Sequence, residues 1–243
     1  MGAPKITEIA EHLNEWDFLQ KLPEEINGFK KVAGTGVEGQ ILHIVSYVNE
    51  AEHRSVDLTY TGETFDYVPV KNIGLHTFRD ERYFCRDQQR FGEIMLEHLP
   101  NLLKEISASH QTKYSYAAKD LQFDQWEGWK KLPKRVGDFE LYITPDNPVN
   151  YINGSCIFLD YTDFEHKSQL YFLFNNFRVE VFGEMLQRNI PVTINTYTVP
   201  EENDHGQRRI VNPSYILPRL TEILAEHLEE DLAKLAQGGF ETI

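Results

Sequence analysis

Cysteine is scarce in this sequence, which excludes a scaffold held together by disulfides. The 243 residues include two cysteines, Cys85 and Cys156, and neither has a second Cys or a His at a metal-binding spacing. Small disulfide-stabilised domains carry more cysteines than this, and a structural zinc site needs about four clustered ligands. The sequence therefore predicts two free thiols, no metal site and no cofactor.

Long apolar runs are also missing. A membrane-spanning helix needs roughly 20 consecutive apolar residues, and no stretch of this chain approaches that length. Residues 1–6 lack the apolar centre of a signal peptide. We therefore expect a cytoplasmic protein with no membrane partner.

Positive charge is in short supply. The chain has 24 Lys and Arg against 38 Asp and Glu, which gives a formal net charge of −14. Such a protein repels the phosphates of nucleic acids and of anionic lipids, so nucleic acid is not an expected partner. A basic protein would be attracted, and its association would be accelerated.

The chain does contain a duplication. W-D-F-L-Q-K-L-P, which begins at Trp16, and W-E-G-W-K-K-L-P, which begins at Trp126, share Trp and Leu-Pro at the same spacing. Three further matches follow in the same order, pairing residues 52–55 with 165–168, 71–73 with 188–190, and 93–99 with 222–228. The period exceeds that of short-repeat solenoids, so it indicates two homologous globular domains.

These matches divide the chain into a first repeat (1–106), a linker (107–123) and a second repeat (124–243). The linker is predicted because this segment is rich in small and polar residues and lacks periodicity.

Each repeat has the pattern of an α+β domain. An N-terminal helix is expected over residues 6–22, and long amphipathic helices are expected over 87–106 and 217–237. Between them lie short aromatic and β-branched runs with connections too short for parallel crossovers. The sequence predicts four to five mostly antiparallel strands per repeat, arranged as a meander. Residues 34–39, Gly-rich but without the Lys-Ser/Thr of a phosphate loop, are predicted to form a turn.

Four histidines occur in matched pairs. His98 and His227 fall on the apolar stripe of their helices and are predicted to be buried core residues. His53 and His166 lie in the Glu-His-Arg/Lys-Ser turns, where a His base with a Ser nucleophile two residues later would be one interpretation. The sequence supplies neither an orienting acid nor an oxyanion loop there. A solvated turn is therefore favoured, and no catalytic residue is predicted.

A polar segment at residues 200–209 has no counterpart in the first repeat. Binding residues concentrate on such loops, so we select its charged side chains, together with the two turn histidines, as candidate binding residues. They are Glu201, Glu202, Asp204, His205, Arg208, Arg209, His53 and His166.

These features favour a non-catalytic cytoplasmic binding protein over an enzyme. One concrete form is an acidic inhibitor or immunity-type protein that masks a basic site on a protein partner. The alternative is an enzyme or small-molecule receptor whose site lies between the two repeats and uses His53, His166 and the polar loop. A third form is a structural subunit that dimerises through a free sheet edge.

Overall fold

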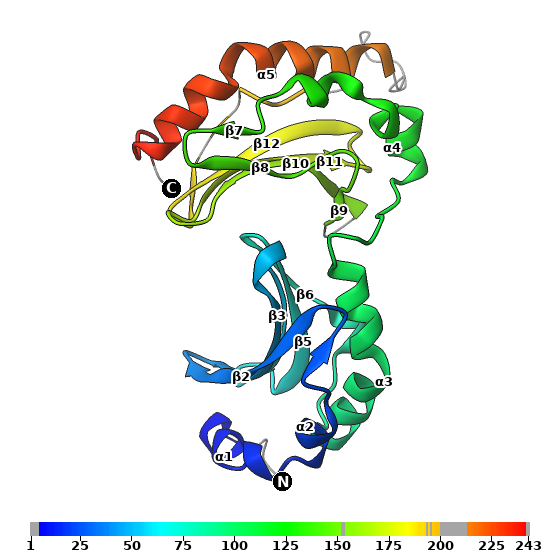
Figure 1. The fold of residues 1–243 in the computed structure, drawn as a ribbon, viewed down its shortest axis with the longest axis vertical. Coiled ribbons are helices and arrows are strands. Elements are labelled where there is room, and N and C mark those ends of the chain that lie inside the picture. Colours follow the sequence, from blue (N-terminus) through cyan, green and yellow to red (C-terminus); the bar gives the residue numbers. More distant parts are fainter. Residues whose placement is uncertain (1–4, 152–153, 193, 195, 200–212, 242–243) are drawn as a thin grey trace. The chain divides into compact units, whose positions relative to one another are not determined.

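The computed structural model describes residues 5–151, 154–192, 194, 196–199 and 213–241. The chain forms two compact units, unit 1 (Met1–His110) and unit 2 (Gln111–Ile243), shown in Figure 1. Each unit combines helices with one antiparallel sheet, so the α+β class is confirmed. None of the helices in the described ranges is both long and apolar enough to cross a membrane.

Unit 1 begins with three short helical segments where the sequence predicts one helix. They are α1 (Ile6–Glu11), η1 (Leu13–Glu15) and α2 (Asp17–Lys21). The break falls at Trp16, whose backbone is extended and whose side chain is only 5% exposed. Burying the indole therefore takes precedence over continuing the helix, because an aromatic ring is among the largest contributors to a core.

The sheet of unit 1 is a meander of six strands in sequence order, all antiparallel. The strands are β1 (Glu25–Ile26), β2 (Phe29–Glu38), β3 (Ile41–Asn49), β4 (Arg54–Thr61), β5 (Asp66–Ile73) and β6 (His76–Arg79). The 3₁₀ turn η2 (Glu50–Glu52) connects β3 to β4, and a second one, η3 (Glu81–Tyr83), follows β6. Helix α3 (Gln88–Ile106) is the last element of the unit. Helix α3 contacts β4 and β5 with its apolar side and buries Phe91, Met95 and Leu99.

Strand β2 corrects the turn predicted at residues 34–39. Residues 36–38 pair with β3 after a register shift between Ala33 and Gly36, and the turn into β3 is confined to Gly39 and Gln40. Gly36 adopts φ +88°, which a glycine accepts without strain. A glycine-rich stretch can thus form a bulged strand as well as a turn.

Unit 2 has a similar plan with a sheet of seven strands, again antiparallel. Its helical segments are α4 (Tyr116–Asp120), η4 (Phe123–Gln125), η5 (Glu127–Lys131) and the long α5 (Pro213–Ala236). Its strands are β7 (Arg135–Val136), β8 (Phe139–Ile143), β9 (Val149–Asn150), β10 (Cys156–Asp163), β11 (Ser168–Asn175), β12 (Glu180–Gln187) and β13 (Ile190–Val192). Helix α5 contacts β11 and β12 (Figure 1).

Six and seven strands exceed the predicted four to five. The difference lies in β2 and in the two-residue strands β1, β7 and β9. A strand of two residues shows no alternation of apolar and polar positions, so the sequence gives no signal for β1, β7 or β9.

Part of the predicted linker is folded into unit 2. Tyr114, Ala118, Leu121 and Phe123 belong to its hydrophobic core, and the last three are fully buried. Helix α4 is capped by the Ser115 side chain, which accepts a hydrogen bond from the Ala118 amide. A helix of five residues is too short to show the periodic spacing of apolar residues that identifies an amphipathic helix. The segment therefore looks like a connection in the sequence.

The Leu-Pro motif is held in the same way in both units. The Tyr47 hydroxyl of β3 donates a hydrogen bond to the Pro23 carbonyl, and the Tyr161 hydroxyl of β10 donates one to the Pro133 carbonyl. Both tyrosines are fully buried. Each bond ties the segment before the sheet to its centre.

Candidate functional sites

The turns that carry His53 and His166 are built alike but hold different residues. In unit 1, Asn49 Oδ1 accepts a hydrogen bond from the Glu52 amide, and His53 follows at φ +51°. In unit 2, Asp163 Oδ1 accepts from the His166 amide at 3.0 Å, and Lys167 follows at φ +52°.

The hydrogen bonds therefore align the two turns one residue away from the sequence match. His53 corresponds to Lys167, and His166 corresponds to Glu52. Both histidines are exposed, but they occupy different positions of their turns. The match of four polar residues in sequence is a weaker guide to equivalent positions than the backbone geometry. The residue with positive φ and the capping side chain determine which positions of the two turns correspond.

The Ser-His interpretation of the second turn is not realised. The Ser168 hydroxyl donates to the His166 backbone carbonyl at 3.3 Å and accepts from the Arg188 amide at 2.9 Å. The His166 ring is engaged elsewhere, with Nδ1 2.8 Å from Asp163 Oδ2. This hydrogen bond, and then the charges of Asp163, Glu165 and Asp138, raise the pKa of His166 above its ordinary value.

The structure brings Asp138 to this pair, which the sequence analysis did not foresee. One potential ligand atom each from Asp138, Asp163 and His166 lies within 4.8 Å of the others. Asp163 has only 3% of its side chain exposed, whereas His166 has 53%. We call these three residues the Asp-Asp-His cluster.

The six charged residues selected between 201 and 209 lie outside the described residues: Glu201, Glu202, Asp204, His205, Arg208 and Arg209. Their candidacy for binding therefore stays a prediction.

Grooves lie at corresponding places in the two units, each lined by the first Trp of the repeated motif. Groove 1, of about 480 Å³, lies between the Trp16 segment and the start of α3. Its lining residues are Glu15, Trp16, Asp17, Phe18, Lys21, Gln88, Gln89, Glu93 and Leu96. Groove 2, of about 450 Å³, lies between the Trp126 segment and the start of α5.

The two grooves differ in charge. Groove 1 is bordered by three carboxylates, Glu15, Asp17 and Glu93, and by one cation, Lys21. Groove 2 has a single charged lining residue, Glu127. In groove 2 the Trp126 Nε1 donates to Thr221 Oγ1 of α5 at 3.1 Å, so the indole is held against the helix by its polar edge.

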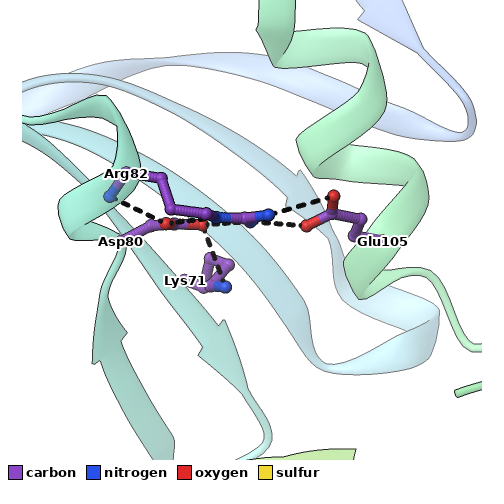
Figure 2. Close-up of polar contacts among 4 residues, drawn as sticks. All are labelled: Lys71, Asp80, Arg82 and Glu105. Atoms are coloured by element: carbon purple, nitrogen blue, oxygen red, sulfur yellow. Dashed lines mark hydrogen bonds and ion pairs between the residues drawn. The ribbon is translucent and has the colours of Figure 1, made fainter. Parts of the chain in front are cut away.

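A second polar cluster, which we call the Asp80 cluster, consists of Lys71, Asp80, Arg82 and Glu105 and has a structural role. Asp80 is almost fully buried, and its carboxylate lies 3.0 Å from Lys71 Nζ and 2.6 Å from Arg82 Nη2 (Figure 2). Arg82 continues to Glu105 of α3 at 2.6 Å. Burial acts to raise the pKa of Asp80, but the hydrogen bonds from Arg82 and Lys71 outweigh it and lower that pKa. The cluster joins β5, η3 and α3.

His98 and His227 correct the prediction of core histidines. Each has 38% of its side chain exposed, and each Nε2 lies 3.6 or 3.7 Å from the neighbouring glutamate. They lie at the edge of the apolar stripe, where a half-polar ring remains in contact with water. Trp16 and Trp126, the tryptophans of the repeated motif, are both buried.

On the sheet of unit 2, Gln169 Oε1 is a buried side-chain acceptor that has no hydrogen-bond partner among the described residues. It lies on β11 opposite Thr162, which donates to the fully buried Asp160 at 2.9 Å. A buried amide oxygen of this kind is commonly met by an internal water.

Comparison with known protein families, with curated proteins and with solved structures finds no match to this chain. The functional argument therefore rests on the residues and their geometry.

Proposed function

We propose that this is a non-catalytic cytoplasmic protein that binds a basic protein partner, with groove 1 as the docking surface. An acidic inhibitor or immunity-type protein is the concrete form we favour. Both cysteines are free thiols, which fits a reducing compartment.

The observation that carries this proposal is the acidic rim of groove 1 around aromatic and aliphatic side chains. The side chains of Glu15 and Glu93 are 74% and 52% exposed, and each makes one surface ion pair, with His12 and Arg90 respectively. A basic partner can replace such weak surface pairs. Trp16 and Phe18 lie beneath them, and Leu96 is exposed at 38%. A Lys or Arg side chain suits such a place, because its stem packs on apolar surface while its charge meets carboxylates.

Groove 1 is preferred over groove 2 for reasons of charge. Complementary charge steers association and selects the partner, and groove 2 has one carboxylate where groove 1 has three. The overall charge of −14 extends the same attraction over a longer range.

We further propose that the two units descend from one duplicated domain. The paired Tyr-to-Pro hydrogen bonds, the matched left-handed turns and the corresponding grooves support this. After a duplication one copy can keep a binding surface while the other changes, which accounts for the unequal charge of the two grooves.

The test is capture of partners from the native lysate by three forms of the tagged protein. The first is the wild type, the second is Glu15→Gln with Asp17→Asn and Glu93→Gln, and the third is a matched control. The control is Glu25→Gln with Glu38→Gln and Glu63→Gln, three exposed carboxylates of the same unit outside the groove. Both variants lose the same net charge, so only the place of the charge differs.

We expect a stoichiometric basic protein to bind the wild type and the control, and to bind the groove variant at least about tenfold more weakly, since each close charge pair contributes 1.5 kcal/mol or more. Its affinity should fall between about 50 and 500 mM salt. Equal loss in both variants would show that net charge alone attracts the partner. Salt-independent binding would contradict the proposal.

A further inference from the structure

We propose that the Asp-Asp-His cluster of unit 2 binds a divalent transition-metal ion, with Zn²⁺ and Mn²⁺ as the class of ligand. The proposal is independent of the partner and of groove 1. It adds a binding site in a region where the sequence predicts no metal.

The first support is the way that three elements bring the ligands together. Asp138 lies in the tight turn between β7 and β8, and Asp163 ends β10. Strands β8 and β10 are paired with Glu140 opposite Thr162, and this register sets the turn beside the strand end. His166 lies three residues beyond Asp163, and its ring bends back to that carboxylate.

The second support is that the two carboxylate oxygens of Asp163 have different partners. Its Oδ1 atom accepts the His166 amide and so caps the turn. Its Oδ2 atom faces the imidazole at 2.8 Å and is the atom that an ion would share with the ring nitrogen. The carboxylate can therefore ligate without giving up its structural hydrogen bond.

The third support is the corresponding turn of unit 1, which is built without these ligands. Gly28 and Asn49 occupy the places of Asp138 and Asp163, and a Cβ on Gly28 would lie 3.7 Å from Asn49 Nδ2. Glu52 replaces His166 and accepts a hydrogen bond from the Ala108 amide at 2.8 Å. The turn therefore forms with one capping oxygen, from Asn49 in unit 1 and from Asp163 in unit 2. It requires neither the Asp138 carboxylate nor the His166 imidazole.

The two carboxylates also place like negative charges close together, and His166 is the side chain that faces them in the structure. Like charges at this separation repel, and Asp163 is nearly removed from water. A divalent ion offsets this repulsion and joins the β7–β8 turn to the end of β10.

The donor set selects the kind of ion. Carboxylates alone suit Mg²⁺ and Ca²⁺, whereas an imidazole adds affinity for zinc and the later transition metals. Three protein ligands are the number found in zinc sites that keep a further position for water. The exposed faces of Asp138 and His166 give the ion a path from solvent.

The experiment measures metal binding by the full chain in two ways. Calorimetric titration with ZnCl₂ gives affinity and stoichiometry, and Mn²⁺-induced broadening of histidine ring signals in NMR locates the ion. The variants are Asp163→Asn and Asp138→Gly, which introduce the residues that unit 1 carries, and His166→Gln. Each is compatible with the turn as unit 1 builds it. The matched control is His227→Gln, because His227 also lies beside a glutamate and has 38% of its side chain exposed.

We expect one Zn²⁺ per chain, with Mn²⁺ broadening the His166 signals first. Each cluster variant should weaken Zn²⁺ binding at least about tenfold, since even supporting residues of metal sites change affinity by that factor, and His227→Gln should leave it unchanged. Absence of stoichiometric binding by the wild type would overturn the proposal. Binding that the three variants leave intact, or that His227→Gln removes, would do so as well.

Discussion

Gly34 is the residue whose side chain, a hydrogen, is most strictly required by its surroundings. A Cβ built there would lie 1.9 Å from the His43 carbonyl oxygen of β3. Backbone atoms of a paired strand cannot move aside as a flexible side chain can. The bulge of β2 therefore depends on this glycine, which explains why a sequence typical of a turn is found in a strand.

We predict that Gly34→Ala destabilises unit 1 by about 3 kcal/mol, at the upper end of overpacking penalties. The free energy of unfolding, measured by urea titration, would report this. Thr35→Ala is the control, because Thr35 is the exposed neighbour and should change stability by less than about 0.5 kcal/mol. An unchanged midpoint for Gly34→Ala would show that β2 does not pair with β3 as described.

The two cysteines differ in accessibility. Cys156 is 7% exposed, and burial raises the pKa of its thiol to about 12, although a backbone hydrogen bond from Phe174 acts in the opposite direction. Cys85 is partly exposed. Only the thiolate reacts with alkylating reagents, so the two thiols should react at different rates.

We predict that iodoacetamide at about pH 8 modifies Cys85 and leaves Cys156 intact in the folded protein. Peptide mass spectrometry of the labelled chain checks this. In guanidinium both cysteines should react, which serves as the control. Equal labelling in the native state would mean that β10 opens on the timescale of the reaction.

At the scale of elements, the Asp80 cluster joins β5 and η3 to α3. Its contribution to stability has a defined pH dependence. The pKa of Asp80 is lower in the folded state than in the unfolded chain, so the folded state favours the ionised carboxylate. The stabilisation is complete above the unfolded pKa, near pH 4, and is lost as the pH falls through the folded value.

We predict that Asp80→Asn destabilises unit 1 by about 1–3 kcal/mol at pH 7, because it leaves cationic donors without their buried acceptor. The difference from wild type should shrink below about pH 4. Glu105→Gln is the comparison, since Glu105 is 39% exposed and such pairs contribute less than about 1 kcal/mol. Urea titrations at several pH values measure both, and a constant difference between wild type and Asp80→Asn across that range would refute the assignment.

Two of the predicted helices show where the local sequence pattern is enough to predict an element and where it is not. The helix predicted over 87–106 matches α3 closely, because its apolar spacing and the Asp87 cap are local signals. The N-terminal helix predicted over 6–22 is broken at Trp16, because burial of the indole is decided by the sheet and not by neighbours in sequence.

At the scale of the whole molecule, the limit between the units falls inside the predicted linker, between His110 and Gln111. Unit 2 includes the segment from Tyr114 to Phe123, which packs into its core. Deleting buried side chains of this size costs several kcal/mol each, and a domain has only about 5–15 kcal/mol in total.

We therefore predict that a fragment of residues 111–243 folds, whereas a fragment of 124–243 does not. Circular dichroism with thermal melting distinguishes them, and residues 1–110 as a separate fragment should melt cooperatively. A folded 124–243 fragment would show that the α4 segment is dispensable to the core.

The sequence alone determines the α+β class, the antiparallel order of strands and the extent of α3. These follow from periodicity, capping and short connections, which act between neighbours along the chain. Tertiary structure decides the pairing of β2, the docking of residues 114–123 and the meeting of Asp138 with Asp163 and His166. That meeting depends on the register of β8 against β10, and register is set by contacts between residues far apart in sequence.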